Sequence, residues 1–403
     1  MEYTASTTSN VRKINKHAVI DLIRFTPGGI SRVDLAREIG LTRAAVTSIV
    51  NDLQALNIVQ EAGNALNGGR SIILEINPNL GKFVGIEMGA THITIILVDA
   101  SAQVLAELEQ PFDITLAPDV CINQIATLFS EFLQSNGVNS SSIMAVGVGV
   151  PGPIVAGAGK VSFPPIMPGW DEFPIRDRLQ NIWGCPVYLG NDAEFGALGE
   201  WAYGAGRSQE NLAYIKIGRG IGAGLLLNGR VYRGTSGSAG EIGHITIEKN
   251  GPLCTCGNRG CLEAMAGGQA IAQKAIEAVK LGRKSMLSDI DDPETITALN
   301  VVSAARRGDL ISQQIIREAG LFIGTAVASL INLFNPSMVV IGGEVSRSGD
   351  LLLEPIRKTV STRSLRGALR GVQITAAYLG NRSTAMGAVV QALSVELHRL
   401  AEA

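Results

Sequence analysis

The chain has 403 residues, of which 46% are hydrophobic, and a formal net charge of −2, which describes a globular protein of two or three domains. It has no uncharged apolar stretch of about 18 residues, so no transmembrane helix is expected. The first residues are polar and lack the apolar core of a signal peptide, so we expect a cytoplasmic protein with no membrane partner.

The first 78 residues are predicted to form a separate domain that begins with three helices. A helix over about 11–25 ends before Pro27-Gly28-Gly29, since proline and glycine both end helices. Ser31 can cap a second helix, and Thr42, which follows a turn at Gly40, can cap a third. The apolar stripe expected on the first helix consists of Val11, Ile14, Ala18, Ile20, Leu22 and Ile23.

The third helix carries the residues that we expect to contact DNA. Its apolar positions recur at helical spacing, so they point inward and leave the opposite face in solvent. Side chains on that opposite face are small or polar, the kinds that can reach base edges in a major groove. The predicted DNA contacts on this helix are Arg43, Thr47, Ser48 and Asn51.

Two predicted strands, near 58–60 and 72–76, follow this helix and are joined by a glycine-rich turn over 63–70. We interpret the turn as a wing, in which Arg70 suits a narrow minor groove. Residues 11–50 hold seven basic side chains against three acidic ones, which favours a polyanionic partner. The whole pattern is typical of a winged helix-turn-helix, and a helical dimerisation module with solvated polar residues is the alternative.

From residue 81 the chain alternates apolar strands with glycine turns, a pattern typical of an α/β body. Three of these turns can bring backbone N–H groups, or a hydroxyl, close to a phosphate or a nucleotide. The possible nucleotide loops contain Gly89, Thr91, Gly218, Gly220, Gly342 and Gly343.

Asn191 and Asp192 follow the predicted strand over 187–190. A carboxylate at a strand end can accept a proton from a sugar hydroxyl, while a neighbouring amide binds the sugar. The alternative is that the two residues are an ordinary helix cap.

Three of the five cysteines lie within eight residues of each other, and His244 precedes them at the spacing H-x9-C-x-C-x4-C. In a reducing compartment such a cluster indicates metal ligands rather than disulfides. Three thiolates and one imidazole make a closed, tetrahedral and therefore structural zinc site. The predicted ligands are His244, Cys254, Cys256 and Cys261, and the alternative is a reduced cluster without metal. Cys121 and Cys185 stand alone and are expected to be buried fillers.

These residues together resemble a known family. The runs Gly240–His244 and Cys254–Glu263 resemble the signature of the ROK family, which comprises repressors, open reading frames and sugar kinases. The similarity covers almost the whole chain, because residues 81–403 resemble the kinase-like body and residues 11–76 resemble the winged helix-turn-helix of the repressor branch.

The resemblance implies an α/β fold: the winged helix-turn-helix over 1–78, then a two-lobed, actin-like ATPase body of the ribonuclease H-like kind. The first lobe would take 79–195 plus about 385–403, and the second, with the zinc site, 196–384. A sugar would lie in the cleft between the lobes. By family pattern its contacts would be Asn191, Asp192, Glu241, His244 and Glu263.

The family pattern also assigns roles to two of these residues. Asp192 would be the catalytic base in a kinase member. His244 would hold zinc with one ring nitrogen and face the sugar with the other, since the metal fixes the tautomer and the ring orientation.

The chain departs from the kinases of the family in both phosphate loops. Family kinases usually have aspartate where this chain has Glu87, and threonine where it has Arg219. They also often have asparagine just before the turn that contains Pro168-Gly169-Trp170. These departures argue against ATP and Mg²⁺ as cofactors and leave the sugar-contact set intact.

We therefore expect a repressor of carbohydrate-utilisation genes that binds a double-stranded DNA operator as a homodimer or higher homo-oligomer, with a monosaccharide or derivative as effector. The alternative is an ATP-dependent sugar kinase that uses Asp192, or a protein with both functions. A purely structural scaffold is the least favoured hypothesis, because the predicted cleft residues are polar.

Overall fold

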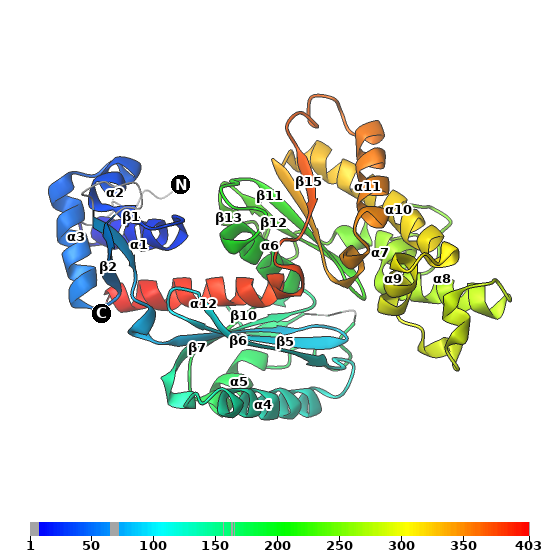
Figure 1. Cartoon of the computed structure of the whole chain (residues 1–403), viewed down its shortest axis with the longest axis horizontal. Coiled ribbons are helices and arrows are strands. Elements are labelled where there is room, and N and C mark those ends of the chain that lie inside the picture. The colour runs from blue at the N-terminus through cyan, green and yellow to red at the C-terminus, as the bar shows by residue number, and fades with distance from the viewer. Residues whose placement is uncertain (1–7, 65–71, 156, 163, 165, 403) are drawn as a thin grey trace.

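A computed structural model describes residues 8–64, 72–155, 157–162, 164 and 166–402. Figure 1 shows an N-terminal head and two α/β lobes, with the last helix of the chain running from beside the second lobe, along the sheet of the first lobe, to the head. This arrangement confirms the fold class that the sequence predicts.

The head is a small three-stranded antiparallel sheet with three helices, and its sheet has the order β1-β3-β2. The side chains of Ser31 and Thr42 accept the backbone N–H groups of Asp34 and Ala45, so both act as the predicted helix caps. Gly40 is left-handed, with φ of 75°, and ends the second helix. The elements are α1 (Thr8–Phe25), β1 (Ile30–Ser31), α2 (Arg32–Ile39), α3 (Arg43–Ala55), β2 (Val59–Asn64) and β3 (Ile72–Ile76).

The predicted apolar stripe of α1 is wrong in its first half. Val11 and Ile14 are 44% and 62% exposed, whereas Val19, Ile20 and Ile23 are buried. The buried positions Val19, Ile20 and Ile23 all belong to the second half of α1, so only that half packs on the core that the head shares with α12.

The first lobe is a mixed sheet of order β10-β7-β4-β5-β6, in which β4, β7 and β10 are parallel and β5 pairs antiparallel with both β4 and β6. Helices α4 and α5 cover one face of the sheet (Figure 1). The elements are β4 (Lys82–Met88), β5 (His92–Asp99), β6 (Val104–Pro111), α4 (Pro118–Ser135), β7 (Ile143–Val150), the short hairpin β8 (Ile154–Val155) and β9 (Lys160–Val161), α5 (Ile175–Trp183) and β10 (Val187–Asn191).

The second lobe repeats this topology in a sheet of order β15-β14-β11-β12-β13. As a result the β4–β5 turn and the β11–β12 turn occupy equivalent positions, one in each lobe. The elements are α6 (Asp192–Tyr203), β11 (Leu212–Ile217), β12 (Ile221–Leu227), β13 (Arg230–Val231), α7 (Leu262–Ala266), α8 (Gly268–Lys280), α9 (Ala298–Arg306), α10 (Leu310–Phe334), β14 (Met338–Gly342), α11 (Asp350–Arg363) and β15 (Gln373–Ala376).

Helix α10 is long and apolar enough to cross a membrane by length and composition alone. Most of its apolar window, 61%, is buried inside the protein. Its place among α9, α11 and the sheet is that of the core helix of the second lobe.

The last helix, α12 (Ser383–Glu402), returns to the first lobe and packs on the face of the sheet opposite α4 (Figure 1). Glycines in β4 and β7 permit this close approach. A Cβ atom on Gly85 would lie 2.0 Å from the carbonyl oxygen of Ala385, and one on Gly147 would lie 2.1 Å from that of Ala388. The far end of α12 lies against α1 of the head.

Candidate functional site: a cleft, a thiol cluster and an exposed helix

The turns of both lobes line one pocket of about 330 Å³, which is within the usual range for small-molecule sites. Of the predicted nucleotide loops, Gly89, Thr91, Gly218, Gly220 and Gly343 line this pocket. Gly342 instead packs on a tyrosine ring, because a Cβ there would lie 2.2 Å from the hydroxyl of Tyr214.

All five residues that the family pattern assigns to the sugar line the same pocket: Asn191, Asp192, Glu241, His244 and Glu263. They come from the β10–α6 junction, the turn after β13 and the start of α7, segments that the fold brings together from both sides of the cleft. Sequence separation alone does not place them side by side.

Asn191 is also the cap of α6, as the alternative interpretation proposed. Its side-chain oxygen accepts the backbone N–H groups of Ala193 and Glu194, at 2.9 and 3.1 Å, and its amide donates to the carbonyl of Gly152. Capping fixes the amide at the mouth of the pocket, so the two interpretations are compatible.

Asp192 is held at both of its carboxylate oxygens. Oδ1 accepts the backbone N–H of Ala193 at 2.8 Å, and Oδ2 accepts the ammonium of Lys216 at 2.6 Å. Lys216 also donates to Glu87 at 2.5 Å. Burial opposes a charge on Lys216, but the carboxylates of Asp192 and Glu87 outweigh it, and the pKa of Lys216 is raised above its usual value.

Lys216 is the main residue that the sequence predictions missed. The only signal for it was a lysine inside the otherwise apolar strand β11. A buried ammonium needs a partner, but the sequence does not say which carboxylate supplies it.

Two acidic side chains of the second lobe line the pocket, Glu241 and Glu263. Glu263 accepts the backbone N–H of Ile221 at 3.0 Å, and a Cβ on Gly220 would lie 2.2 Å from the same carboxylate oxygen. Glycine at position 220 therefore makes room for this carboxylate. Burial raises the pKa of Glu241, which lines the pocket beside His244.

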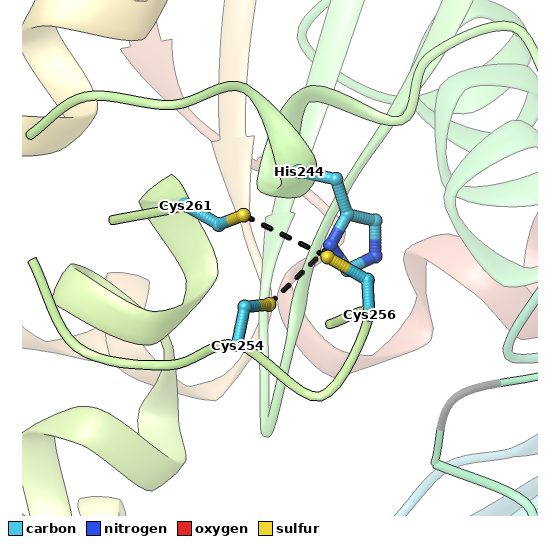
Figure 2. Close-up of side chains that lie close together, drawn as sticks. All are labelled: His244, Cys254, Cys256 and Cys261. Carbon is cyan, nitrogen blue, oxygen red and sulfur yellow. Dashed lines mark hydrogen bonds between the residues drawn. The ribbon is translucent and has the colours of Figure 1, made fainter. Parts of the chain in front are cut away.

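The predicted metal ligands converge on one point. One ligand atom from each of His244, Cys254, Cys256 and Cys261 lies within 4.8 Å of all the others. Figure 2 shows the three thiols and the imidazole turned toward one another. Zinc bonded to sulfur at about 2.3 Å in a tetrahedron places sulfur atoms about 3.8 Å apart. The Sγ atoms of Cys256 and Cys261 are 3.7 Å apart, so the residues fit a zinc ion.

Tight turns bring these ligands together. Gly260 is left-handed, with φ of 67°, and a Cβ there would lie 1.6 Å from the carbonyl oxygen of Glu248.

Burial disfavours the Cys256 thiolate, but hydrogen bonds from the Asn258 backbone and the neighbouring thiols outweigh it and lower the pKa of Cys256 to about 7.

His244 connects the thiol cluster with the pocket. Its Nδ1 atom lies 3.7 Å from Cys254 Sγ, and its Nε2 atom lies 4.0 Å from the carboxylate of Glu241. One ring nitrogen thus faces the sulfur atoms and the other faces the cleft, the geometry that a double role requires.

Helix α3 lies at the edge of the molecule (Figure 1). Arg43, Thr47, Ser48 and Asn51 are exposed on it, and Val46, Ile49, Val50 and Leu53 are buried beneath. The Thr47 hydroxyl donates to the Arg43 carbonyl at 2.8 Å, within the helix. Arg70 lies outside the described residues.

Comparison with protein-family models identifies the family of this chain, because the model of the ROK family matches residues 83–394. The chain belongs to the ROK family. The xylose repressor of Caldicellulosiruptor bescii is 31% identical over 386 residues, which cover 95% of this chain and 96% of that protein.

Two solved structures are similar to this ROK protein. A crystal structure of a ROK family transcriptional regulator, a homolog of the Escherichia coli MLC protein, superposes with a TM-score of 0.80 at 28% identity and covers 97% of this chain and 99% of that one. The ROK family glucokinase from Streptomyces griseus, crystallised with glucose and AMPPNP, has a TM-score of 0.70 at 30% identity and covers 77% of this chain and 99% of that one. The regulators thus match the head as well as the body, whereas the glucokinase matches about the length of the body.

Proposed function

We propose that this ROK protein is a cytoplasmic transcriptional repressor of carbohydrate-utilisation genes that releases its DNA operator when a monosaccharide enters the cleft. The single observation that carries the proposal is that helix α12 runs from a pocket of polar side chains to a head that exposes the polar face of α3. The full-length similarity to a xylose repressor supports it. A two-fold dimer would present two α3 helices to successive major grooves.

The pocket suits a neutral sugar. Carboxylates of Asp192, Glu241 and Glu263 can accept hydrogen bonds from sugar hydroxyls, while Pro151 and Ile166 offer apolar contacts to the faces of the ring. The similar glucokinase was crystallised with glucose, which supports a monosaccharide as the effector of this chain.

His244, Cys254, Cys256 and Cys261 would hold one structural zinc ion. With four protein ligands such an ion supplies no open position for water; it fixes the 244–261 segment. The segment in turn holds the His244 Nε2 atom toward Glu241 and the start of α7 at Glu263.

Helix α12 is the element that would carry the signal. At its first turn the Thr384 hydroxyl donates to the carbonyl of Asp192 at 3.0 Å, and Thr384 itself lines the pocket. The second turn of the helix is tightly packed, because a Cβ on Gly387 would lie 1.6 Å from the carbonyl oxygen of Phe195. A ligand that shifts α6 therefore shifts α12 with it.

The other end of α12 holds the head. Arg24 of α1 donates to the Ser394 hydroxyl at 2.6 Å and to the Val390 carbonyl at 3.1 Å. Near the terminus Lys13 pairs with Glu402 and Asp21 contacts His398, each at about 3 Å. The sugar can change DNA affinity only if it binds more tightly to one arrangement of body and head than to another.

The proposed function is tested with DNA selected by the purified protein from a random duplex library. Fluorescence anisotropy with that duplex should show tenfold or greater loss of DNA affinity with one of D-xylose, D-glucose or N-acetyl-D-glucosamine, since coupling free energies of about 1–3 kcal/mol are typical. The Glu263→Ala variant should bind the duplex equally well and ignore the sugar. No response to any of these sugars, in anisotropy and in thermal unfolding alike, would refute the proposal.

The second candidate function is a sugar kinase, which the position of Asp192 in the pocket favours. We propose instead that the chain is not an enzyme, because Lys216 bridges Asp192 and Glu87, and Glu87 stands where kinases of the family usually have aspartate. A coupled assay should detect no ADP release with the same sugars. Turnover that Asp192→Asn abolishes would assign the kinase function.

Loosening the head from α12 should uncouple it from the cleft. Arg24→Ala removes the contacts to Ser394 and Val390, so we expect unchanged sugar affinity by calorimetry and a sugar effect on DNA affinity reduced at least threefold. The matched control is Arg399→Ala, which removes an ion pair with Glu396 inside α12 and leaves α1 untouched. An equal sugar effect in wild type and Arg24→Ala would exclude this route.

A further inference from the structure

The cleft already contains a cation near the ends of β4 and β11. The Lys216 ammonium lies 2.5 Å from a Glu87 oxygen and 2.6 Å from an Asp192 oxygen, so these two carboxylate oxygens are at most about 5 Å apart. The side chains of Glu87, Lys216 and Asp192 are only 4%, 12% and 14% exposed. Solvent therefore screens this group weakly.

Two carboxylate oxygens this close together can both bind one divalent cation, because such ions take oxygen ligands at about 2.0–2.6 Å. The ammonium nitrogen has the place that such an ion would take. A Mg²⁺ ion could enter only by displacing Lys216, and the displaced ammonium would then be buried without its partners.

The surroundings are also unfavourable for a nucleotide triphosphate. Glu344 follows the Gly343 turn and lines the pocket, and burial raises its pKa. When Glu344 is ionised, its charge adds to the negative charge of Glu87. The Nε2 atom of His92 lies 3.9 Å from a Glu87 oxygen. The residues present therefore do not fit Mg²⁺ and ATP, although kinases of the family use them.

We propose that Lys216 is a resident cation that replaces the divalent ion of the cleft, and that its ammonium is what prevents Glu87 and Asp192 from binding a metal. The cleft of this chain then binds its ligands without Mg²⁺ or nucleotide. Removal of the ammonium, with no other change, creates a divalent-cation site. This inference goes beyond the proposed function and does not depend on which sugar binds.

The test is a titration of the full-length, zinc-loaded protein with Mn²⁺, in which the free ion is followed by its electron paramagnetic resonance signal. Lys216→Met keeps the length of the side chain and removes its charge, so this variant should bind one more Mn²⁺ per chain than the wild type. Adding Glu87→Gln should abolish that additional site. Lys274→Met, which removes a partly buried lysine of α8 that pairs with Glu318 at 3.1 Å, should bind as many ions as the wild type.

A second measurement uses the wild type alone and stands even if the Lys216 variants do not fold. A fluorescent ATP analogue with Mg²⁺ should show no saturable binding that millimolar ATP displaces. The proposal is overturned if the wild type binds the nucleotide in this way. It is equally overturned if Lys216→Met, folded by circular dichroism and zinc content, binds no more Mn²⁺ than the wild type. Absence of sugar binding would refute the proposed function and leave these results unaffected.

Discussion

Cys256→Ser should lower the zinc content of the purified protein from about one ion per chain to near zero. The thiolate is one of four ligands that lie within 4.8 Å of one another, and a hydroxyl is a poor replacement because it stays protonated at neutral pH. Since loss of even a residue that only supports a ligand costs 10–100-fold in metal affinity, loss of a ligand should cost at least about 100-fold. Atomic absorption of the dialysed protein measures this.

The same variant should lose its response to sugar, because the segment that the proposed zinc ion would order carries His244 and leads directly into Glu263. Cys185→Ser is the matched control: this cysteine is also buried, but in the core of the first lobe, and should leave zinc and the sugar response in place. Equal zinc content in Cys256→Ser and wild type would refute Cys256 as a zinc ligand. Loss of zinc with a normal sugar response would show that the sugar response does not depend on the metal.

The features that the sequence predicts well are local. The cluster of His244 with three cysteines spans 18 residues, and the caps at Ser31 and Thr42 each bind a backbone group three residues away. In such short segments the residue types and their spacing nearly determine the geometry. The strands β4, β7 and β11 were also predictable, because their apolar runs end in glycine turns.

The features that the sequence does not predict depend on long-range packing. Lys216 meets Glu87 across 129 residues, and only the pairing of the two lobes decides that these side chains meet. The contacts of α1 with α12 join residues more than 360 positions apart. For the same reason, periodicity identified an apolar face on α1 but could not show that Val11 and Ile14 lie beyond the core of the head.

Asn51→Ala should weaken binding to the selected duplex by about 5- to 150-fold per head, the range that corresponds to one good base contact. Asn51 lies on the exposed face of α3, and its amide is the kind of group that pairs with adenine in the major groove. Such a contact identifies one base pair. The loss of affinity caused by Asn51→Ala should therefore be much smaller for the duplex in which that base pair is replaced. Anisotropy titrations against a set of single-base variants measure both effects.

Arg43→Ala distinguishes the two ways in which α3 can contact DNA. If the Arg43 guanidinium binds a phosphate, its removal weakens binding to all duplexes alike and lowers the slope of log affinity against log salt by about 1. If it binds a guanine edge, the loss depends on sequence, as for Asn51. Arg306→Ala removes an exposed arginine at the end of α9 and should change neither affinity nor slope. Full DNA affinity in Asn51→Ala and Arg43→Ala together would exclude α3 as the recognition helix, and with it the winged helix-turn-helix as the DNA-binding unit.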